Sequence, residues 1–448
     1  MEQNSNFETK MADEYESFIS NQKESFMIKK LKNTPDPFNW ELPSSKSHFI
    51  RWLFLAAQTQ KKSIIKAPGS IGNDILSCVK VLEKLGVTIK KRDYWSVNGC
   101  NPSEFNRNPG MLDCGNSATT LRFLSLLLAR NGITAKIIGD ESLSSRNFSE
   151  LFQVLEYGGV SIKKENGDFL PFTINGVFKP NIIEVFTKKT SQLISALLIT
   201  MPSSIEKNTI KFVDTIVSKP YFELTVDLCE KTGSNLVISE DSIVILPWEP
   251  QINEEIIIPG EGSLILFPML FSKLHKCRVL VKNWPKKEDA LGFDSIKDFL
   301  SDIGLIWIND GESIIIDFSD YKSKFFSIDI RNNIDMITPL SIIMAISEGG
   351  IITGIENAVN KETNRIKSTI HLCNEFGIDL DHNSDLFISK SELSIPKNRI
   401  LANGDHRLQM SAIVLITHLG GLVESFEWYA NSDPDFIKRL YCQQVSIS

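Results

Sequence analysis

The sequence predicts an α/β protein of two lobes, and three observations lead to this prediction. The chain has 448 residues, which is too long for one hydrophobic core, so two domains of roughly 200 residues each are expected. Helix-like and strand-like segments alternate along the chain, as is typical of layered α/β folds. One phrase also recurs, in which an amphipathic helix ends at a glycine and a β-prone run follows at once.

The repeated phrase has a nearly constant spacing. Its helix-ending glycines are separated by 73, 74, 71 and 73 residues, and they are Gly86, Gly159, Gly233, Gly304 and Gly377. Glycine is expected just past a helix C-terminus because it tolerates the left-handed conformation there. Single copies mean little, because the phrase is common in α/β proteins; the constant spacing is what indicates an internal repeat. About six such units would fill the chain, and each is too long for a solenoid repeat.

The lobe boundaries are predicted from composition. Residues 1–37 are polar and poorly periodic, and we interpret them as an N-terminal extension without an assigned function. Pro259-Gly260 follows a strand-like run and an acidic linker, which places the main boundary there. We therefore predict one discontinuous lobe of residues 38–44 and 259–448, and a second lobe of residues 45–258.

Composition argues against several classes of protein. The net charge of -7 is unlike the basic excess of a nucleic-acid binder, although a few Lys and Arg can still converge on a small anion. The seven cysteines are never spaced as CxxC, which predicts a reducing compartment, no disulfide framework and no zinc site. The longest apolar stretches are about half a membrane span, and the N-terminus does not resemble a signal peptide. We expect a cytoplasmic protein that binds neither membrane nor nucleic acid.

Four segments of the second lobe open helices with small or polar residues. They are Ser45-Lys46-Ser47 with Arg51, Gly115-Asn116-Ser117-Ala118 through Arg122, Lys189-Thr190-Ser191-Gln192, and Val217-Ser218-Lys219-Pro220-Tyr221. Such helix starts can leave backbone N–H groups facing an anion. Lys46 lies in a first turn, where the helix dipole disfavours a cation, so it usually has a negative partner or a functional role. Taken singly, each segment could equally be the capped start of a core helix.

Three segments of the first lobe carry charges beside apolar helices. Asp335 interrupts an apolar stretch, where a carboxylate is either a charge for the helix dipole or a general base. Lys361-Glu362-Thr363-Asn364-Arg365 opens a helix that would put Glu362 and Arg365 on one face, with a surface ion pair as the alternative. Asp405-His406-Arg407 could be a plain acidic cap, but Arg suits bidentate recognition of a carboxylate or phosphate.

Read in order, these segments resemble the signature blocks of the 5-enolpyruvylshikimate-3-phosphate synthases, within the enolpyruvyl transferase family. The match covers about Leu42 to Phe436, and its KExxR and DHR blocks are the most specific parts. The resemblance implies the two-lobed enolpyruvyl transferase fold, an inside-out α/β barrel with three βαβαββ units in each lobe. This agrees with the repeat found from spacing alone.

The resemblance also implies a reaction. The enolpyruvyl group of phosphoenolpyruvate would pass to the 5-hydroxyl of shikimate 3-phosphate, with release of phosphate, by addition and elimination in a cleft that closes between the lobes. This is a step of the shikimate pathway of aromatic amino acid biosynthesis. No metal or cofactor is implied, and we expect a monomer. Closure would orient the substrates, an effect that can supply roughly 7–11 kcal/mol.

Individual roles follow from the same resemblance. Asp335 would take the proton of the acceptor hydroxyl, and Glu362 with Lys46 would deliver and remove the proton at the methylene carbon. Shikimate 3-phosphate would be bound by Lys46, Ser47, Arg51, Thr190, Ser191, Gln192, Ser218, Tyr221, Asp335, Asn357 and Lys361. Phosphoenolpyruvate would be bound by Lys46, Asn116, Ala118, Arg146, Gln192, Arg365, His406 and Arg407.

Four positions depart from the usual pattern of the family. Ala118 stands where Gly is common, and its methyl group would crowd the phosphoenolpyruvate pocket, so we predict weak inhibition by glyphosate. Ser142 stands where many members carry Arg, although Arg146 follows. Asn431 replaces a usual Lys and Asn364 a usual Asp, which leaves the strength of phosphoenolpyruvate binding open.

Two other functions stay open. A related enolpyruvyl transferase could act on a UDP-sugar or a nucleoside, but the UDP-sugar enzymes usually carry a reactive Cys in the loop that corresponds to residues 139–146, and none is present. An inactive copy of the fold could serve as a binding protein, but Lys46, Asp335 and Glu362 are all retained. Phosphate release from phosphoenolpyruvate with each acceptor would discriminate between these functions.

Overall fold

The computed structural model describes residues 25–32, 34–253, 255–309, 313–318 and 322–442. By its contacts the chain falls into two compact units. Unit 1 comprises Met1–Leu42, Gly262–Trp284 and Phe293–Ser448, and unit 2 comprises Pro43–Glu261 and Pro285–Gly292. The short segment Pro285–Gly292, predicted in the first lobe, therefore belongs to unit 2.

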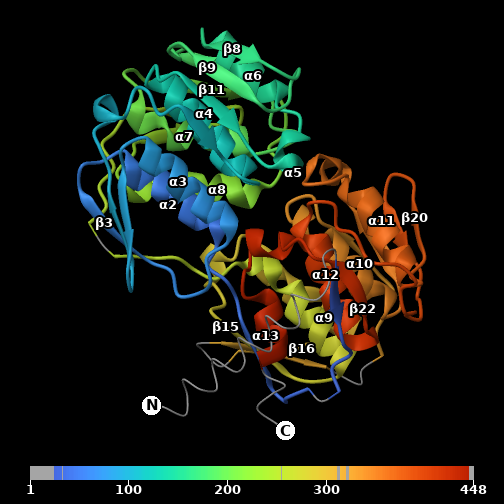
Figure 1. Ribbon diagram of the computed structural model, residues 1–448. Helices are drawn as coiled ribbons and strands as arrows, with labels where there is room; N and C mark the ends of the chain where they lie inside the picture. Colours follow the sequence, from blue (N-terminus) through green and yellow to red (C-terminus); the bar gives the residue numbers. More distant parts are fainter. Residues whose placement is uncertain (1–24, 33, 254, 310–312, 319–321, 443–448) are drawn as a thin grey trace. The chain divides into compact units, whose positions relative to one another are not determined.

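Unit 2 contains three four-stranded sheets of one design (Figure 1). In each sheet the first two strands are parallel, and the last two form antiparallel pairs. The first sheet has the order β14 (Ile256–Ile257), β3 (Lys62–Lys66), β5 (Trp95–Asn98), β4 (Thr88–Lys91). The second is β6 (Met111–Asp113), β7 (Ala135–Ile138), β9 (Phe172–Asn175), β8 (Ser161–Lys164). The third is β10 (Ile182–Val185), β11 (Asn208–Phe212), β13 (Ser242–Ile245), β12 (Leu236–Ile238).

The helices of unit 2 alternate with these strands. They are α2 (Lys46–Ala57), α3 (Asn73–Lys84), α4 (Ala118–Arg130), α5 (Glu141–Ser144), α6 (Ser149–Tyr157), α7 (Gln192–Ile199) and α8 (Lys219–Lys231). The short 3-10 helices of this unit are η1 (Pro102–Glu104), η2 (Met201–Ser203) and η4 (Lys287–Asp289). Strand, helix, strand, helix and two strands thus form one repeating unit, as the spacing of the glycines predicts.

Unit 1 repeats the design in two four-stranded sheets. Their orders are β2 (Phe38–Glu41), β15 (Val279–Lys282), β17 (Ile314–Phe318), β16 (Leu305–Asn309), and β18 (Phe326–Asp329), β19 (Gly350–Thr353), β21 (Leu386–Ile388), β20 (Leu380–His382). The helices among its described residues are α9 (Leu266–His275), α10 (Ile337–Ala345), α11 (Arg365–Glu375), α12 (His406–Leu419) and α13 (Phe436–Cys442). Its 3-10 helices are η3 (Gly262–Leu264), η5 (Phe293–Phe299), η6 (Ser301–Ile303), η7 (Ile334–Met336), η8 (Glu356–Asn360) and η9 (Trp428–Asn431).

The last repeat of unit 1 is completed by the N-terminal segment. Strand β1 (Ser25–Ile28) pairs antiparallel with β22 (Gly421–Glu424), and Ile400 forms a parallel bridge to the same strand. Phe26 and Ile28 are buried. Residues 1–37 were predicted to be an extension, but residues 25–32 are part of the fold; residues 1–24 lie outside the described part.

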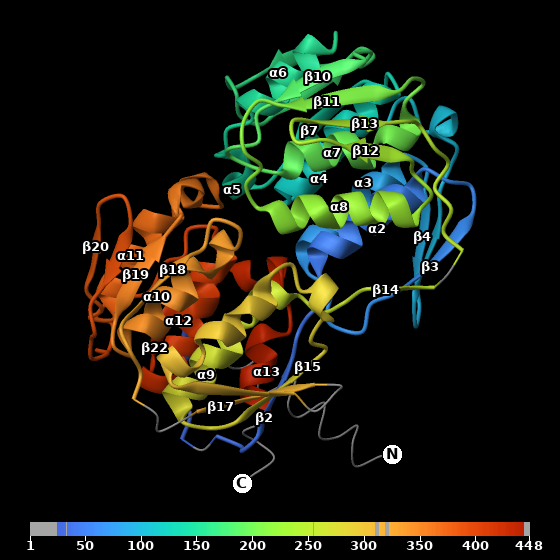
Figure 2. The same cartoon turned by 180° about the vertical axis from the view of Figure 1, so that it is seen from behind.

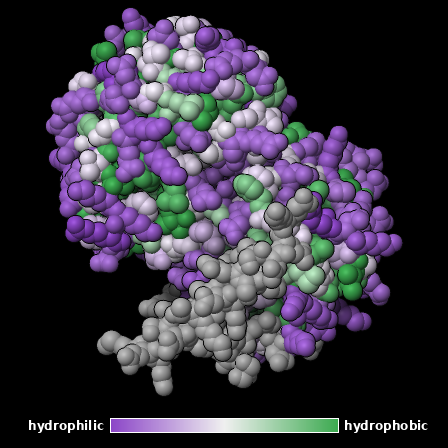
Figure 3. Space-filling view, viewed as in Figure 1, coloured by the Kyte–Doolittle hydropathy of each residue, from purple (hydrophilic) through white to green (hydrophobic). Residues whose placement is uncertain are grey.

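Each unit has helices at its centre, α7 in unit 2 and α10 in unit 1 among them, while its sheets and helices such as α6 and α11 lie further out (Figures 1 and 2). All nine residues of α10 are buried, and in α7 only the first residue, Gln192, is not. A helix that is apolar around its whole circumference has to be surrounded by other elements. Hydrophilic residues cover most of the face that Figure 3 shows, with apolar residues in small groups. The predicted fold class, an inside-out arrangement of α/β repeats, is confirmed.

No helix among the described residues could cross a membrane. The longest, α12, has 14 residues, whereas a span takes about 20.

Candidate active site

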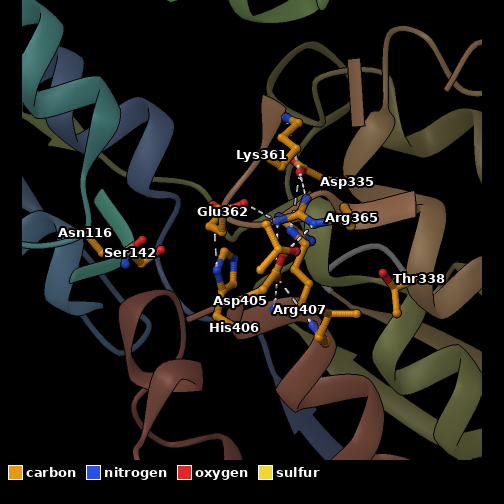
Figure 4. Close-up of polar contacts among 12 residues, drawn as sticks. Asn116, Ser142, Asp335, Thr338, Lys361, Glu362, Arg365, Asp405, His406 and Arg407 are labelled. Carbon is orange, nitrogen blue, oxygen red and sulfur yellow. Dashed lines mark hydrogen bonds and ion pairs between the residues drawn. The ribbon is translucent and has the colours of Figure 1, made fainter. Parts of the chain in front are cut away.

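The predicted residues of unit 1 converge around Arg365 (Figure 4). Helix α11 begins at Arg365, and the side chain of Asn364 caps it by accepting a hydrogen bond from the Lys367 amide at 3.2 Å. The sequence analysis expects Glu362 on the same helix face as Arg365; instead, Glu362 lies in the segment before the helix. Proximity in the chain, rather than helical periodicity, therefore brings these two residues together.

Arg365 contacts three carboxylates. Its Nε donates to Asp405 Oδ2 at 2.8 Å and its Nη1 to Asp335 Oδ1 at 2.6 Å, while Nη2 donates to Glu362 Oε2 and to Asp405 Oδ1. The side chain is 0% exposed, so this is no surface ion pair. Burial alone would lower the pKa of Arg365, but Asp405, Glu362 and Asp335 together raise it above its ordinary value. The guanidinium is therefore a permanent cation at the centre of the cluster.

Asp335 is surrounded by cations. Besides Arg365, Lys361 Nζ lies 3.4 Å and Arg407 Nε 3.6 Å from its Oδ1. The carboxylate is 18% exposed and sits in η7 at the start of the buried α10. Opposite charges at these distances stabilise the ionised form of a carboxylate. Asn357 lies in η8, the turn that precedes Lys361.

Helix α12 contributes the next two residues through its first turn. Arg407 is buried, and it donates to Ser263 O at 2.9 Å and to Ser263 Oγ at 2.7 Å. His406 is buried as well, and its Nδ1 lies 3.9 Å from Glu362 Oε1. Both side chains thus start from the same helix N-terminus and approach different carboxylates, His406 that of Glu362 and Arg407 that of Asp335.

Asp405 is a functional candidate that the sequence analysis considers only as a cap. It does cap α12, since its Oδ1 accepts from the Arg407 amide at 2.9 Å and the Leu408 amide at 3.4 Å. Both of its oxygens also bind Arg365, and it is 0% exposed. One buried carboxylate therefore sets the positions of both α12 and Arg365, and only the tertiary structure could reveal the second role.

In unit 2, the first turn of α2 holds Lys46 and Ser47. Lys46 Nζ donates to Asp74 Oδ2 at 2.9 Å, and Asp74 is a buried residue at the start of α3. This is the negative partner expected for a cation at a helix N-terminus. Asp74 is 28 residues away in the chain, which is why sequence reasoning missed it.

Arg51 lies one turn further along α2 and is 2% exposed. Its Nε donates to Thr225 Oγ1 at 2.8 Å, and its Nη atoms donate to the carbonyls of Ser47 at 2.9 Å and Tyr221 at 3.1 Å, and to Ser195 Oγ at 3.4 Å. Burial lowers the pKa of Arg51 to about 10, against the charge interaction with Tyr221. All four of these partners are formally neutral in their ordinary state, in contrast to those of Arg365.

A second group gathers at the start of α4. Arg146 Nη2 donates to Asn116 Oδ1 at 2.7 Å and to Ser142 Oγ at 3.2 Å. The amide nitrogen of Asn116 donates to Asp140 Oδ2 at 2.8 Å, which sets the orientation of the amide. Ala118, the first residue of α4, is half-buried beside this group.

The hydroxyl and amide residues around α7 form a third group. The backbone N–H of Gln192 donates to Thr190 Oγ1 at 3.1 Å, and Ser191 Oγ donates to the carbonyl of Ser218 at 3.4 Å. Ser218 adopts a left-handed conformation with φ 52° as it begins α8, which carries Tyr221. Arg122 Nη1 donates to Gln192 Oε1 at 2.6 Å. Arg122 belongs to the α4 segment singled out from sequence, but no role was assigned to it there.

Comparisons with known proteins agree with this picture. A sequence model of the family described as EPSP synthase (3-phosphoshikimate 1-carboxyvinyltransferase) matches residues 39–440. The 3-phosphoshikimate 1-carboxyvinyltransferase of Methanocorpusculum labreanum is 26% identical over 400 residues, covering 88% of this chain and 93% of that protein. That of Methanococcoides burtonii is 29% identical over 377 residues, covering 82% and 86%.

Solved structures show the same fold. EPSP synthase from Acinetobacter baumannii superimposes with a TM-score of 0.72 at 20% identity, covering 93% of this chain and 97% of that one. The enolpyruvyl transferase NikO from Streptomyces tendae does so with a TM-score of 0.69 at 12% identity, covering 93% and 96%. The fold is therefore that of the enolpyruvyl transferases.

The chain belongs to the EPSP synthase family, because the family model spans most of its length. Its activity is that of a 3-phosphoshikimate 1-carboxyvinyltransferase, a transferase of the shikimate pathway. The family implies phosphoenolpyruvate and shikimate 3-phosphate as substrates. The function predicted from sequence is confirmed at this level, and the roles of individual residues stay predictions.

Proposed function

We propose that Asp335 is the general base that takes the proton of the acceptor hydroxyl in this reaction. The observation that carries the proposal is the set of three cations around its Oδ1, formed by Arg365, Lys361 and Arg407. They hold the carboxylate ionised, as a base requires. A substrate anion that engages Lys361 or Arg407 would take a counter-charge away from Asp335 and make it a stronger base.

Glu362 is the proposed acid–base group for the methylene carbon, together with Lys46. Glu362 is 14% exposed; Arg365 donates a hydrogen bond to its Oε2, and His406 Nδ1 lies 3.9 Å from its Oε1. A carboxylate whose position is set in this way can give up and recover a proton without reorganising its surroundings. Lys46 keeps Asp74 as its partner, so its ammonium group has a defined place at the start of α2.

Arg365 is proposed to act on phosphoenolpyruvate differently from Arg146. The Arg365 side chain is fully buried and meets three carboxylates, so a direct contact with a substrate carboxylate requires Asp335 or Glu362 to move. Arg146 is half-buried and is held by Asn116 and Ser142. Its charge is thus compensated less by these partners, which suits the binding of an anion.

The two catalytic carboxylates are tested by Glu362→Gln and Asp335→Asn, with Lys46→Ala for the cation of unit 2. We expect each variant to fold and to lose most phosphate release from phosphoenolpyruvate in the presence of shikimate 3-phosphate. Unchanged turnover in Lys46→Ala and Glu362→Gln would refute the assignment. Release that depends on a UDP-sugar or a nucleoside instead of shikimate 3-phosphate would refute the acceptor.

We also propose that the protein works as a monomer in the cytoplasm. The wide scatter of its cysteines along the chain is compatible with a reducing compartment. Sedimentation velocity across a range of protein concentrations tests the monomer, and a mass that grows with concentration while activity rises would contradict it.

A further inference from the structure

Two polar side chains hold the chain on either side of the Asp405-His406-Arg407 block, and the reaction as proposed does not use them. Before the block, the Glu424 side chain binds the backbone of Ala402; after it, the Gln409 side chain binds the backbone that follows β22. We call these contacts the upstream and the downstream anchor. Both end on β22 or on the segment after it, which lie beside α12 (Figures 1 and 2).

The upstream anchor reaches Asp405 through a single peptide. Glu424 Oε1 accepts a hydrogen bond from the Ala402 amide at 2.6 Å, and the Ala402 carbonyl accepts one from the Asp405 amide at 3.0 Å. The Ile400 carbonyl accepts from the Glu424 amide at 3.0 Å, so the segment is held to β22 at two points. Residues 403–404 both have positive φ, 51° and 89°. Glu424 thus holds the tight turn from which Asp405 enters α12.

The downstream anchor is Gln409, which is 0% exposed. Its Nε2 donates to the carbonyls of Phe426 at 2.5 Å and Glu424 at 3.5 Å, and its Oε1 accepts from the Tyr429 amide at 2.8 Å. These partners are all main-chain groups, so they fix which way the side-chain amide points. A buried amide that loses its partners costs free energy. Gln409 therefore ties the beginning of α12 to the backbone after β22.

The groups that the reaction is proposed to use lie between the two anchors. His406 and Arg407 are the first two residues of α12, and Asp405 binds the buried guanidinium of Arg365. Side chains that are already in place when a substrate arrives need no ordering on binding, and a misplacement of about 1 Å can cost on the order of 100-fold in rate. Fixing the backbone on both sides of the block limits such misplacement.

A buried hydrogen bond without this connection lies at the other end of the same helix. Thr417 is 0% exposed, its Oγ1 donates to the Val414 carbonyl at 2.6 Å, and His275 Nε2 lies 2.9 Å from it. These contacts stabilise the C-terminal end of α12, ten residues beyond Arg407. Thr417 is therefore the comparison that separates the stability of α12 from the position of its first turn.

We propose that Glu424 and Gln409 are positioning residues: they fix the Asp405-His406-Arg407 block from both sides and so set the place of the groups that bind phosphoenolpyruvate. The inference rests on the proposed function and on the predicted binding of phosphoenolpyruvate by His406 and Arg407. Neither Glu424 nor Gln409 touches the substrate in this proposal; both act through the backbone of the block.

Steady-state kinetics tests the positioning role. Gln409→Met keeps the size of the buried side chain but removes its hydrogen bonds, and Glu424→Leu removes the acceptor of the Ala402 amide. We expect each variant to raise KM for phosphoenolpyruvate by about tenfold, with smaller changes in kcat and in KM for shikimate 3-phosphate. Glu424→Gln keeps an acceptor for the amide and should restore the KM of the unchanged protein.

Two variants serve as controls. Thr417→Val loses a buried hydrogen bond of α12 and should lower stability while leaving both KM values as they are. Glu427→Leu makes the Glu424→Leu change at an exposed residue of the same segment, and it should alter neither constant. A fall in kcat with both KM values unchanged in Gln409→Met and Glu424→Leu reports a smaller folded fraction and overturns the positioning role. Should Gln409→Met not fold, the Glu424 variants decide the question.

Amide hydrogen exchange tests the anchors without relying on the reaction. Glu424→Leu should speed exchange at the Ala402 and Asp405 amides by about tenfold, and Gln409→Met should do so at Tyr429. Unchanged exchange at Asp405 overturns the upstream anchor and the proposal with it. Faster exchange beside an unchanged KM for phosphoenolpyruvate in Arg407→Gln refutes the binding role of Arg407, and with it the positioning role, while the anchors themselves are confirmed.

Discussion

Arg365 of unit 1 and Arg51 of unit 2 are both buried, but their hydrogen-bond partners are of opposite kinds. Arg365 of unit 1 meets three carboxylates, and their charges raise its pKa despite burial. Arg51 of unit 2 is almost as deeply buried, but it meets carbonyls and hydroxyls, and burial lowers its pKa to about 10. Arg122 resembles Arg51: burial first, and then the charge of Arg146, lower its pKa to about 10.

This difference suggests a division of labour. A cation balanced by carboxylates positions acids and bases, whereas a cation held by neutral dipoles keeps its charge for an anionic ligand. We therefore propose that the Arg365 cluster of unit 1 serves as an acid–base centre, and that Arg51 and the helix starts beside it in unit 2 bind an anion.

The largest effect is expected from the carboxylates of unit 1. Glu362→Gln keeps the shape of the side chain but removes the group that exchanges a proton, so kcat should fall by about 100- to 10,000-fold. Steady-state kinetics with both substrates measures it. Glu356→Gln, a change at an exposed residue of η8, is the matched control and should leave kcat as it is. Equal kcat values for the two variants would end the view of unit 1 as the acid–base centre.

The second prediction concerns the buried ion pair. Asp405→Asn removes one of the three carboxylates that balance the buried charge of Arg365. It should lower the free energy of unfolding by about 3–5 kcal/mol. Chemical denaturation measures this value. Asp329→Asn removes a partner of Arg331 in an exposed pair, with side chains 43% and 64% exposed, and should cost less than about 1 kcal/mol. Similar losses in both variants would show that burial does not determine how much an ion pair contributes to stability.

Unit 1 should also respond to acid through His275. Burial, followed by the charges of His418 and Lys30, lowers its pKa from the ordinary 6.5 to about 4. Between these values the unfolded chain binds a proton that the folded chain does not, so stability falls as the pH drops through that window, by about 3 kcal/mol. Unfolding followed by denaturant at several pH values measures the slope, and His275→Asn should flatten it. An equally steep slope in the variant would rule His275 out as its source.

The neutral partners of unit 2 should each matter less. Thr225→Val preserves the shape but removes the acceptor of Arg51 Nε, and a lost buried hydrogen bond should cost about 1–2 kcal/mol. Comparing its loss of unfolding free energy with that of Asp405→Asn shows how much more a charged partner contributes to a buried arginine than a neutral one. A loss as large as that of Asp405→Asn would contradict the contrast between the units.

The smallest effect is expected at Ala118. Removing its methyl group with Ala118→Gly should strengthen inhibition by glyphosate by on the order of fivefold, equivalent to about 1 kcal/mol. Inhibition measured against phosphoenolpyruvate tests this, with Ala129→Gly in the buried end of α4 as a control for loss of helix stability. An inhibition constant already in the low micromolar range in the unchanged protein would refute the prediction.

Much of this protein could be predicted from sequence, for local reasons. The glycines spaced by 71 to 74 residues mark helix ends, which depend on backbone conformation alone. Lys46 lies in the first turn of a helix, where the helix dipole disfavours a cation, and this position predicted a negative partner. The blocks read in order indicated the family, and the KExxR and DHR blocks are the most specific of them, because each is a contiguous run of residues.

Only the tertiary structure decided which residues from distant parts of the chain come into contact. Asp74 beside Lys46, Asp405 beside Arg365, and the pairing of β1 with β22 each join segments far apart in the chain. Such pairs depend on how the repeats pack against one another, and no local pattern of residues predicts which segments meet. The sequence determined the kinds of chemical groups and the repeat that carries them, whereas the packing determined whether a cation faces a carboxylate or a dipole.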